Sequence, residues 1–174
     1  MEEKIGEVVL NLDDYDGEDL YSDGDVEEEL LEIVKQYSPD EYQEQINRRA
    51  KWPLLYHLSE QRENIIDWFP MKEKASVLEV GAGCGAITGA LTRRAARVVA
   101  NDLSKRRSSI NAWRHRQDKN LELIVGNFNR AADRMKERFD YVTLIGVLEY
   151  APSYIQEKEP FAAFLEKING LLKE

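Results

Sequence analysis

Three glycines in five positions follow a short apolar run that carries one carboxylate. The run is VLEV at 77–80, with Glu79 as its acid, and Gly81, Gly83 and Gly85 come after it. Glycine tolerates positive φ and lets another group approach the backbone closely. A helix beginning after such a turn offers unpaired backbone N–H groups. The segment therefore predicts a turn at the end of a strand, with a ligand lying against its backbone.

The class of ligand depends on two carboxylates. Gly81, Gly83 and Ala86 satisfy G-x-G-x-x-A, and Asp102 follows 21 residues after Gly81, as a dinucleotide-binding unit requires. NAD fits those features. Glu79 would repel a pyrophosphate but suits a cationic ligand, and S-adenosylmethionine carries a sulfonium and an amino group without phosphate. We therefore favour S-adenosylmethionine, with NAD and a packing turn without ligand as the alternatives.

Alternating apolar runs and helical stretches surround these residues. Strands are expected at 76–80, 97–102, 121–126 and 141–147, and helices at 85–95, 104–117, 130–137 and 159–172. Strands rich in Val, Ile and Leu with helices between them predict β-α-β units and an α/β fold with a parallel sheet. Ligands of such sheets bind beyond the carboxyl ends of the strands.

The region before the first of these strands is acidic and has a different pattern. Residues 1–32 hold fourteen acidic residues and one Lys, whereas the rest of the chain holds 19 acidic and 23 basic residues. A short strand or hairpin is expected at 5–10, and helices at 25–37, 40–50 and 54–68, with Asp25 as the N-cap of the first. We divide the chain into an acidic N-terminal extension, 1–50, and a second domain, 51–174. The acidic run is either a solvated surface or a docking segment, and it disfavours nucleic acid as a partner.

Several kinds of site are disfavoured. Cys84 is the single cysteine, so no internal disulfide is possible, and no set of His, Cys and acidic residues has metal-ligand spacing. His115 lies in the basic stretch WRHR and is expected to be solvated. The acidic start is unlike a secretory signal, and no apolar run approaches the roughly 18 residues of a membrane span. A cytoplasmic protein is expected.

Four motifs in order resemble the class I S-adenosylmethionine-dependent methyltransferases. They are VLEVGAGCGAITGAL at 77–91, ANDLS at 100–104, IVGNF at 124–128 and FDYVTLIGVLEY at 139–150. The resemblance covers roughly residues 54–172. It implies a Rossmann-like sheet with seven strands in the order 3-2-1-4-5-7-6, of which the sequence supplies four. We therefore expect a methyltransferase sheet truncated after the fourth strand, as in a fragment of a longer protein.

The resemblance also assigns a cofactor site. Its residues are Glu79, Gly81, Ala82, Gly83, Gly85, Asp102, Leu103, Asn127, Phe128, Ile145 and Gly146, together with Arg62 of the preceding helix. Asp102 would bind both ribose hydroxyls, and Glu79 would organise the turn and reach the amino group. Asn127, where the family usually has Asp, would meet the adenine amino group. Arg62 would reach the methionine carboxylate.

The acceptor of the methyl group is less well marked. The segment after the fourth strand lacks the Asn/Asp-Pro-Pro-aromatic turn of adenine amino-methyltransferases, so an rRNA adenine dimethylase-like enzyme is a weaker alternative. Its VLEY ending is closer to small-molecule methyltransferases, with Tyr150 as a weak candidate for orienting an acceptor hydroxyl. The N-terminal pattern, YHLSEQREN and VGNFN are similar to modules associated with bacterial glycosyltransferases and polysaccharide biosynthesis, which suggests a glycan-type acceptor.

Two further expectations concern the chain as a whole. A non-catalytic module that binds S-adenosylmethionine, with the acidic segment as its docking region, is the alternative to an enzyme. An apolar strand at 141–147 on a sheet edge would expose unpaired backbone groups. We therefore expect a homodimer through the edge of the fourth strand.

Overall fold

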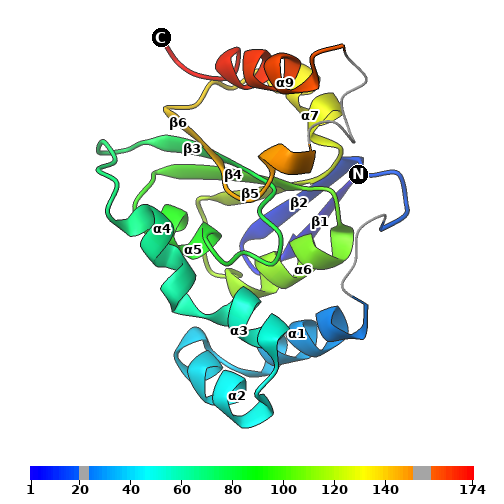
Figure 1. Cartoon of the computed structure of the whole chain (residues 1–174), viewed down its shortest axis with the longest axis vertical. Coiled ribbons are helices and arrows are strands. Elements are labelled where there is room, and N and C mark those ends of the chain that lie inside the picture. Colours follow the sequence, from blue (N-terminus) through cyan, green and yellow to red (C-terminus); the bar gives the residue numbers. More distant parts are fainter. Residues whose placement is uncertain (20–23, 151–157) are drawn as a thin grey trace.

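Six strands form one mixed sheet in the computed structural model of the chain, which describes residues 1–19, 24–150 and 158–174 (Figure 1). The strands are β1 (Glu2–Ile5), β2 (Val8–Asp14), β3 (Ser76–Val80), β4 (Arg97–Asp102), β5 (Leu121–Gly126) and β6 (Tyr141–Leu144). Their order is β1-β2-β5-β4-β3-β6. Among these described strands, β1 runs antiparallel to its neighbour β2, and the other pairs are parallel. The expected Rossmann-like α/β sheet is confirmed.

Helices cover both faces of this sheet. They are α1 (Asp25–Gln36), α2 (Tyr42–Arg49), α3 (Trp52–Leu58), α4 (Asn64–Asp67), α5 (Thr88–Thr92), α6 (Lys105–Arg114), α7 (Phe128–Arg134) and α9 (Pro160–Asn169), with 3-10 turns at Pro39–Glu41, Glu60–Glu63 and Leu148–Tyr150. In Figure 1, α5 and α6 lie on one side of the sheet and α7 and α9 on the other. None of the described helices has the length and apolar composition that a membrane crossing requires.

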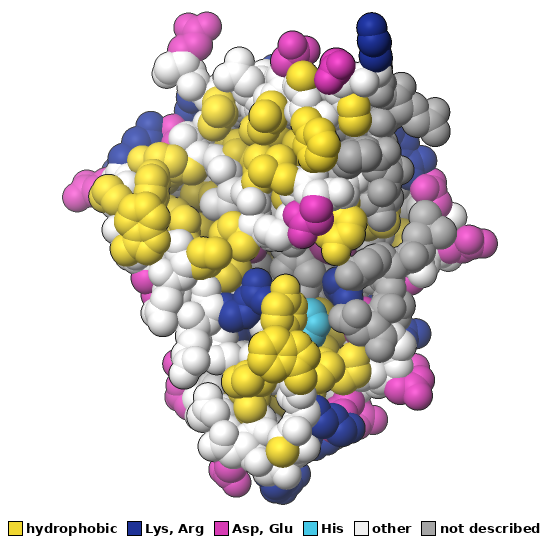
Figure 2. Space-filling model, in the orientation of Figure 1, with side chains coloured by type: hydrophobic (Ala, Val, Ile, Leu, Met, Phe, Trp, Pro, Cys, Tyr) yellow, Lys and Arg dark blue, Asp and Glu magenta, His cyan; other side chains and the backbone are white. Residues whose placement is uncertain are grey.

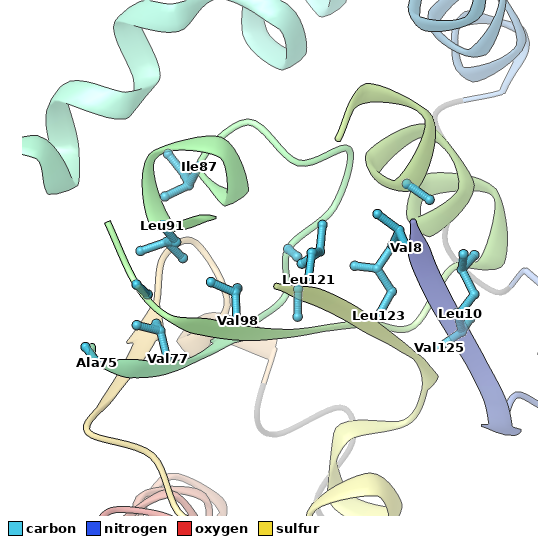
Figure 3. Close-up of a cluster of buried hydrophobic side chains, with 14 of the residues drawn as sticks. Val8, Leu10, Ala75, Val77, Ile87, Leu91, Val98, Leu121, Leu123 and Val125 are labelled. Carbon is cyan, nitrogen blue, oxygen red and sulfur yellow. The ribbon is translucent and has the colours of Figure 1, made fainter. Parts of the chain in front are cut away.

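Each central strand packs on both faces, which explains its continuous apolar sequence. Val77 and Val98 belong to the core between the sheet and α5 and α6 (Figure 3). Leu78 and Val99, one residue further along, belong to the core on the side of α7 and α9, together with Phe164. Successive side chains of a strand point to opposite faces, so a strand covered on both sides is apolar throughout.

The N-terminal residues are part of the sheet. The β1–β2 hairpin joins it because β2 pairs in parallel with β5, with Asp14 opposite Gly126. A third core then packs α1, α2 and α3 on α6, and it includes Leu30, Tyr42 and Ile110. The sheet and helices of residues 1–50 are therefore continuous with the packing of the rest of the chain.

Ion pairs attach the acidic segment to α6 and α7. Lys105 of α6 contacts Glu3 at 2.6 Å, and the Arg107 Nε–H donates to Glu27 at 2.8 Å. On α7, Arg130 and Arg134 contact Asp16 and Asp14 at 2.5 and 2.6 Å. Asp14 and Glu27 are therefore buried in these pairs, whereas Glu3 and Asp16 remain partly exposed to solvent. The negative charges of these acidic side chains offset the positive charges of basic side chains that lie more than 70 positions away in the sequence.

The expected helix at 54–68 is interrupted. Ser59 has an extended backbone, with φ −65° and ψ 130°, and its hydroxyl accepts a hydrogen bond from the Gln61 N–H at 3.3 Å. Serine competes in this way for backbone groups that would otherwise continue a helix. The segment therefore divides into α3, a 3-10 turn and α4.

The start of α1 and the end of β6 also differ from expectation. Asp25 is the first residue of α1, and Gly24, with φ 73°, takes the N-cap position. β6 ends at Leu144, and Gly146, with φ 67°, lies beyond it in a left-handed conformation. Glycine adopts such a backbone more readily than any other residue. The apolar run at 141–147 thus contains a strand and the turn that follows it.

Gly126 provides a test of how the hairpin joins the sheet. A Cβ at this position would lie 2.1 Å from the Asp14 carbonyl oxygen, and φ is 130°. We expect Gly126→Ala to lower the free energy of unfolding by about 3 kcal/mol or more, because backbone strain adds to overlap between main chains. Urea unfolding followed by circular dichroism measures the loss.

Gly17→Ala is the matched control. Gly17 also has positive φ, at 88°, but nothing lies within 4 Å of a Cβ placed there. Its substitution should cost about 1–2 kcal/mol, from backbone strain alone. Equal losses for the two variants would show that the hairpin does not press against Gly126.

Candidate functional site

The glycine turn joins β3 to α5 and is held by β4. The Gly81 and Ala82 N–H groups donate to the Asn101 carbonyl at 2.8 and 3.0 Å. Gly81, Gly83 and Gly85 all have positive φ. A Cβ on Gly81 would lie 2.9 Å from Val147, whereas nothing lies within 4 Å of a Cβ on Gly83. Gly83 therefore faces open space, as expected for a backbone that a ligand approaches.

Gly85 is required for a different reason. A Cβ on Gly85 would lie 2.4 Å from Asn111 Oδ1 and 3.1 Å from His115 Nε2, both on the α6 side. The Gly85 carbonyl also lies 3.1 Å from His115 Nε2. The close approach that excludes a side chain here comes from the protein itself. Gly85 is the one expected site residue that does not line the cavity described next.

A cavity of about 630 Å³ lies over the glycine turn and the ends of the neighbouring strands. Its lining includes every expected site residue apart from Gly85, namely Arg62, Glu79, Gly81, Ala82, Gly83, Asp102, Leu103, Asn127, Phe128, Ile145, Gly146 and Tyr150. These residues come from the carboxyl ends of β3, β4, β5 and β6 and from the turn before α4. Four sequence motifs thus meet at one edge of the sheet, where ligands of open parallel sheets bind.

Glu79 lies beneath the turn and is buried from solvent. Glu79 is 4% exposed, and its carboxyl group accepts a hydrogen bond from the Thr88 hydroxyl at 2.6 Å. The Asn111 amide in turn donates to the Thr88 hydroxyl oxygen at 3.0 Å. Burial raises the pKa of Glu79 to about 7, with a smaller opposing contribution from the Thr88 hydrogen bond. The carboxyl is therefore poised to gain or lose a proton near neutral pH.

Asp102 connects the first two crossover loops. Its Oδ2 accepts the Gly83 N–H at 2.8 Å, and its Oδ1 accepts the Ser104 N–H at 2.9 Å. Burial raises the pKa of Asp102, and these two hydrogen bonds oppose the shift. A carboxylate oxygen has two acceptor positions, so each oxygen retains capacity for a ligand hydroxyl.

Asn127 and Phe128 begin α7 at the end of β5. The Asn127 side chain accepts the Asn129 N–H at 2.9 Å and so caps the helix. Phe128 packs its ring on Phe164, with centroids 5.6 Å apart. The amide at 127 thus has a structural use at the position where the resemblance implies an acid.

The far wall of the cavity is aromatic. Trp52, Tyr56 and His57 of α3 line it, and the Arg62 guanidinium lies 4.0 Å from the centre of the Tyr56 ring. The Tyr56 ring meets His57 edge to face at 4.9 Å. On the face shown in Figure 2, hydrophobic side chains gather in separate groups, with basic side chains and a histidine between them. Arg62 therefore stacks on an aromatic ring at the edge of the cavity.

Comparisons with known proteins agree with this geometry. A family profile described as "Methyltransferase domain" matches residues 78–174, which is more than half of the chain. The chain belongs to this methyltransferase family. No curated protein matches the sequence.

Solved structures show the same fold as this methyltransferase domain. YjhP from E. coli is 18% identical, with a TM-score of 0.52, 66% of this chain covered and 45% of that one. A Thiobacillus denitrificans S-adenosylmethionine-dependent methyltransferase in complex with S-adenosyl-L-homocysteine is 16% identical, with the same TM-score and shares. A Bacillus cereus O-methyltransferase, also in complex with S-adenosylhomocysteine, is 19% identical, with a TM-score of 0.56, 85% of this chain covered and 68% of that one. This chain therefore spans about half the length of the first two of these proteins.

Some residues of the site were not identified from the sequence of the chain. Trp52, Pro53 and His57 line the cavity, and so do Val26 and Arg107. The spacing of Trp52 and Tyr56, four apart on a helix, was the available signal for the aromatic wall. Nothing local indicated Val26 or Arg107, because their place depends on the packing of α1 against α6.

The expectation for His115 is wrong. Its side chain is 11% exposed and lies against the glycine turn. Burial, with a smaller contribution from Arg114, lowers the pKa of His115 to about 3, so the ring is neutral at physiological pH. Cys84 is buried, and burial raises the pKa of its thiol. Among the residues that the structure describes, no three His, Cys, Asp or Glu side chains come together as metal ligands would.

The raised pKa of Glu79 predicts a particular dependence of stability on pH. Below the ordinary pKa of 4.5 the group is protonated in both states, and it carries no penalty. As the pH rises through 4.5, the unfolded state ionises first, so the native state loses up to about 3 kcal/mol relative to it by pH 8. Glu79→Gln removes this contribution. The difference in free energy of unfolding between Glu79→Gln and the wild type should therefore shift in favour of the variant by about 3 kcal/mol between pH 4.5 and 8.

Chemical denaturation at several pH values measures the difference between the two proteins. Glu32→Gln, at an exposed position of α1, is the control and should stay parallel to the wild type. A parallel course for Glu79→Gln as well would show that Glu79 ionises normally in the native state.

Proposed function

We propose that the chain binds S-adenosylmethionine in the 630 Å³ cavity and transfers its methyl group to a small-molecule or glycan-type acceptor. The observation that carries this proposal is the buried Glu79 carboxyl beneath an open glycine turn. Among the described residues no basic side chain forms an ion pair with that carboxyl, although the charge of Arg114 acts on it. A cationic, phosphate-free nucleoside would give it a positive partner in direct contact. A pyrophosphate would instead meet two carboxyl groups, at 79 and 102.

The residues of the cavity suit the parts of this cofactor in order along the sheet edge. Asp102 has acceptor capacity for the ribose hydroxyls, and Leu103 and Phe128 offer apolar surface to adenine. Asn127 provides an amide beside the adenine amino group. Gly83 and Glu79 lie where the ribose and the amino-acid part would pass. The structural neighbours in complex with S-adenosylhomocysteine support this choice of ligand.

Methyl transfer from this cofactor is a displacement at carbon. The bound cofactor would supply an activated methyl carbon, to which the acceptor atom would bond as the bond to sulfur broke, with the neutral thioether as leaving group and the proton of an acceptor hydroxyl passing to solvent. The protein contributes alignment and exclusion of water. Ile145 and Gly146, at the end of β6, border the region where the methyl group would lie, and Tyr150 is in reach of the same cavity.

The aromatic wall supports an acceptor with an apolar face, such as a sugar ring or a flat small molecule. Trp52 is 69% exposed and Tyr56 is 44% exposed at the edge of the cavity. Aromatic rings with a polar edge bind partly apolar, partly polar ligands well. Transfer of labelled methyl groups to glycan precursors, compared with transfer to RNA, tests the acceptor class. Binding of cofactor with no transfer to any acceptor would identify a non-catalytic binding module instead.

Asp102→Ala tests the site itself. Loss of its hydrogen bonds to the ligand should weaken binding of S-adenosylhomocysteine by about 1–3 kcal/mol, which is roughly five- to 150-fold in the dissociation constant. Isothermal titration calorimetry measures the affinity. Asp40→Ala, on an exposed turn between α1 and α2, should leave it unchanged. An unaltered affinity in Asp102→Ala would remove this residue from the site.

We also propose that two copies of the chain pair through β6. Among the described residues β6 is the last strand on its side of the sheet, with only the neighbouring Phe139 bridged to Leu172. Tyr141, Val142 and Leu144 are partly exposed along it. Light scattering should show a dimer at about 100 µM, and Val142→Lys should shift it towards monomer, because charge on an edge strand opposes pairing. A wild-type monomer at that concentration would contradict the proposal.

A further inference from the structure

The acidic N-terminal segment reaches the loop that holds Asp102. Val26, next to the buried Glu27, lines the cavity itself. Asp19 lies at the start of α6, directly after the loop Asp102–Ser104. Asp19 and Glu27 of the acidic segment therefore both lie beside the connection between β4 and α6. Neither residue belongs to the second domain, 51–174, that contains this connection.

Asp19 binds the first turn of α6 from outside the helix. Its Oδ1 accepts the Lys105 N–H at 2.7 Å, and its Oδ2 accepts the Arg106 N–H at 3.1 Å. The Ser104 hydroxyl accepts the next N–H, from Arg107, at 3.2 Å. Three backbone donors that a helix start leaves unpaired are thus satisfied, two of them by one carboxylate from far along the chain.

This set of hydrogen bonds is continuous with the glycine turn. The Ser104 N–H donates to Asp102, and the other oxygen of Asp102 accepts the Gly83 N–H. A displacement of the first turn of α6 would therefore move Ser104, Asp102 and Gly83 together. Asp19 is the group that fixes the outer end of this series.

Glu27 fixes the same region through a side chain. It is fully buried, and it accepts a hydrogen bond from the Arg107 Nε–H at 2.8 Å. Arg107 is 11% exposed at its side chain and lines the cavity. Burial and the negative charge of Glu27 raise the pKa of Asp102, whereas the positive charge of Arg107 lowers it. Glu27 thus sets where that charge lies relative to Asp102.

We propose that Asp19 and Glu27 are positioning residues for the nucleoside end of the cavity, acting through α6 on the loop that carries Asp102. This inference rests on the proposed function for the identity of the ligand. The acidic segment then has a specific task in ligand binding, in addition to the hairpin that it adds to the sheet. Affinity for the nucleoside should depend on residues that do not touch it.

Asp19→Asn tests this with little risk to folding, because the amide retains one acceptor oxygen. It should weaken binding of both S-adenosylhomocysteine and adenosine by roughly fivefold, the size of a lost helix-capping interaction. The two losses should be equal, because the loop contacts the nucleoside part that the ligands share. Asp16→Asn is the matched control, since Asp16 lies in the same segment but pairs with Arg130 on α7.

A double-mutant cycle separates positioning from general weakening. If Asp19 acts through Asp102, then Asp19→Asn should cause no further loss in the Asp102→Ala background. If each substitution instead weakens ligand binding by its own full factor in the double variant, the inference is overturned. Equal losses of affinity in Asp19→Asn and Asp16→Asn would also overturn it. Glu27→Gln is the second variant, and it should give the same pattern if it folds.

Hydrogen exchange of the ligand-free protein tests the inference without reference to the ligand. Asp19→Asn should accelerate exchange of the Gly83 and Ser104 amides, which the series of hydrogen bonds protects, and leave the amides of α7 unchanged. Unchanged exchange at Gly83 and Ser104 would overturn it. If the wild type binds neither ligand but the exchange result holds, the proposed function fails and the positioning role remains.

Discussion

The two hydrogen bonds accepted by Asp102 hold the candidate site together. One comes from Gly83, in the loop after β3, and the other from Ser104, in the loop after β4. In a parallel sheet these two loops emerge side by side, and the Asn101 carbonyl of β4 accepts the Gly81 and Ala82 N–H groups at the start of the first loop. Further along both loops, a single carboxylate joins them, with a backbone N–H on each oxygen. The ligand-facing surface of the cavity is therefore set by a side chain that would itself bind the ligand.

That arrangement explains why elements far from the cavity matter to it. α6 begins at Lys105, directly after the second loop, and His115 just beyond its end contacts the Gly85 carbonyl of the first loop. The Asn111 amide of the same helix reaches Thr88, which donates to Glu79. One helix thus supports both loops, and the N-terminal segment supports that helix. The cavity thus depends first on the two loops, then on α6 behind them, and then on the N-terminal segment that contacts α6.

Sequence patterns predicted the parts of this structure that are local. The apolar runs gave β3, β4 and β5 with their bounds, because strands buried on both faces have few other residue types to use. The glycine turn and Asp102 followed from spacing within one β-α-β unit. The pairing of Glu27 with Arg107 and of Asp19 with the start of α6 did not follow, since it joins residues about 80 positions apart. His115 was misplaced for the same reason, because basic neighbours in the sequence do not reveal which face of a helix meets a turn.

Two buried carboxylates, those of Glu27 and Glu79, lead to the same conclusion about the ligand. Glu27 has the guanidinium of Arg107 at hydrogen-bond distance. Glu79 has a neutral hydroxyl, and within the described residues no basic side chain forms an ion pair with it. Burying a carboxylate without a cation is costly, and proteins ordinarily avoid it or protonate the group. Glu79 lines an open cavity, so a cation can reach it from outside the chain. A ligand with positive charge near its amino-acid end would supply what Arg107 supplies to Glu27, and a dinucleotide would not.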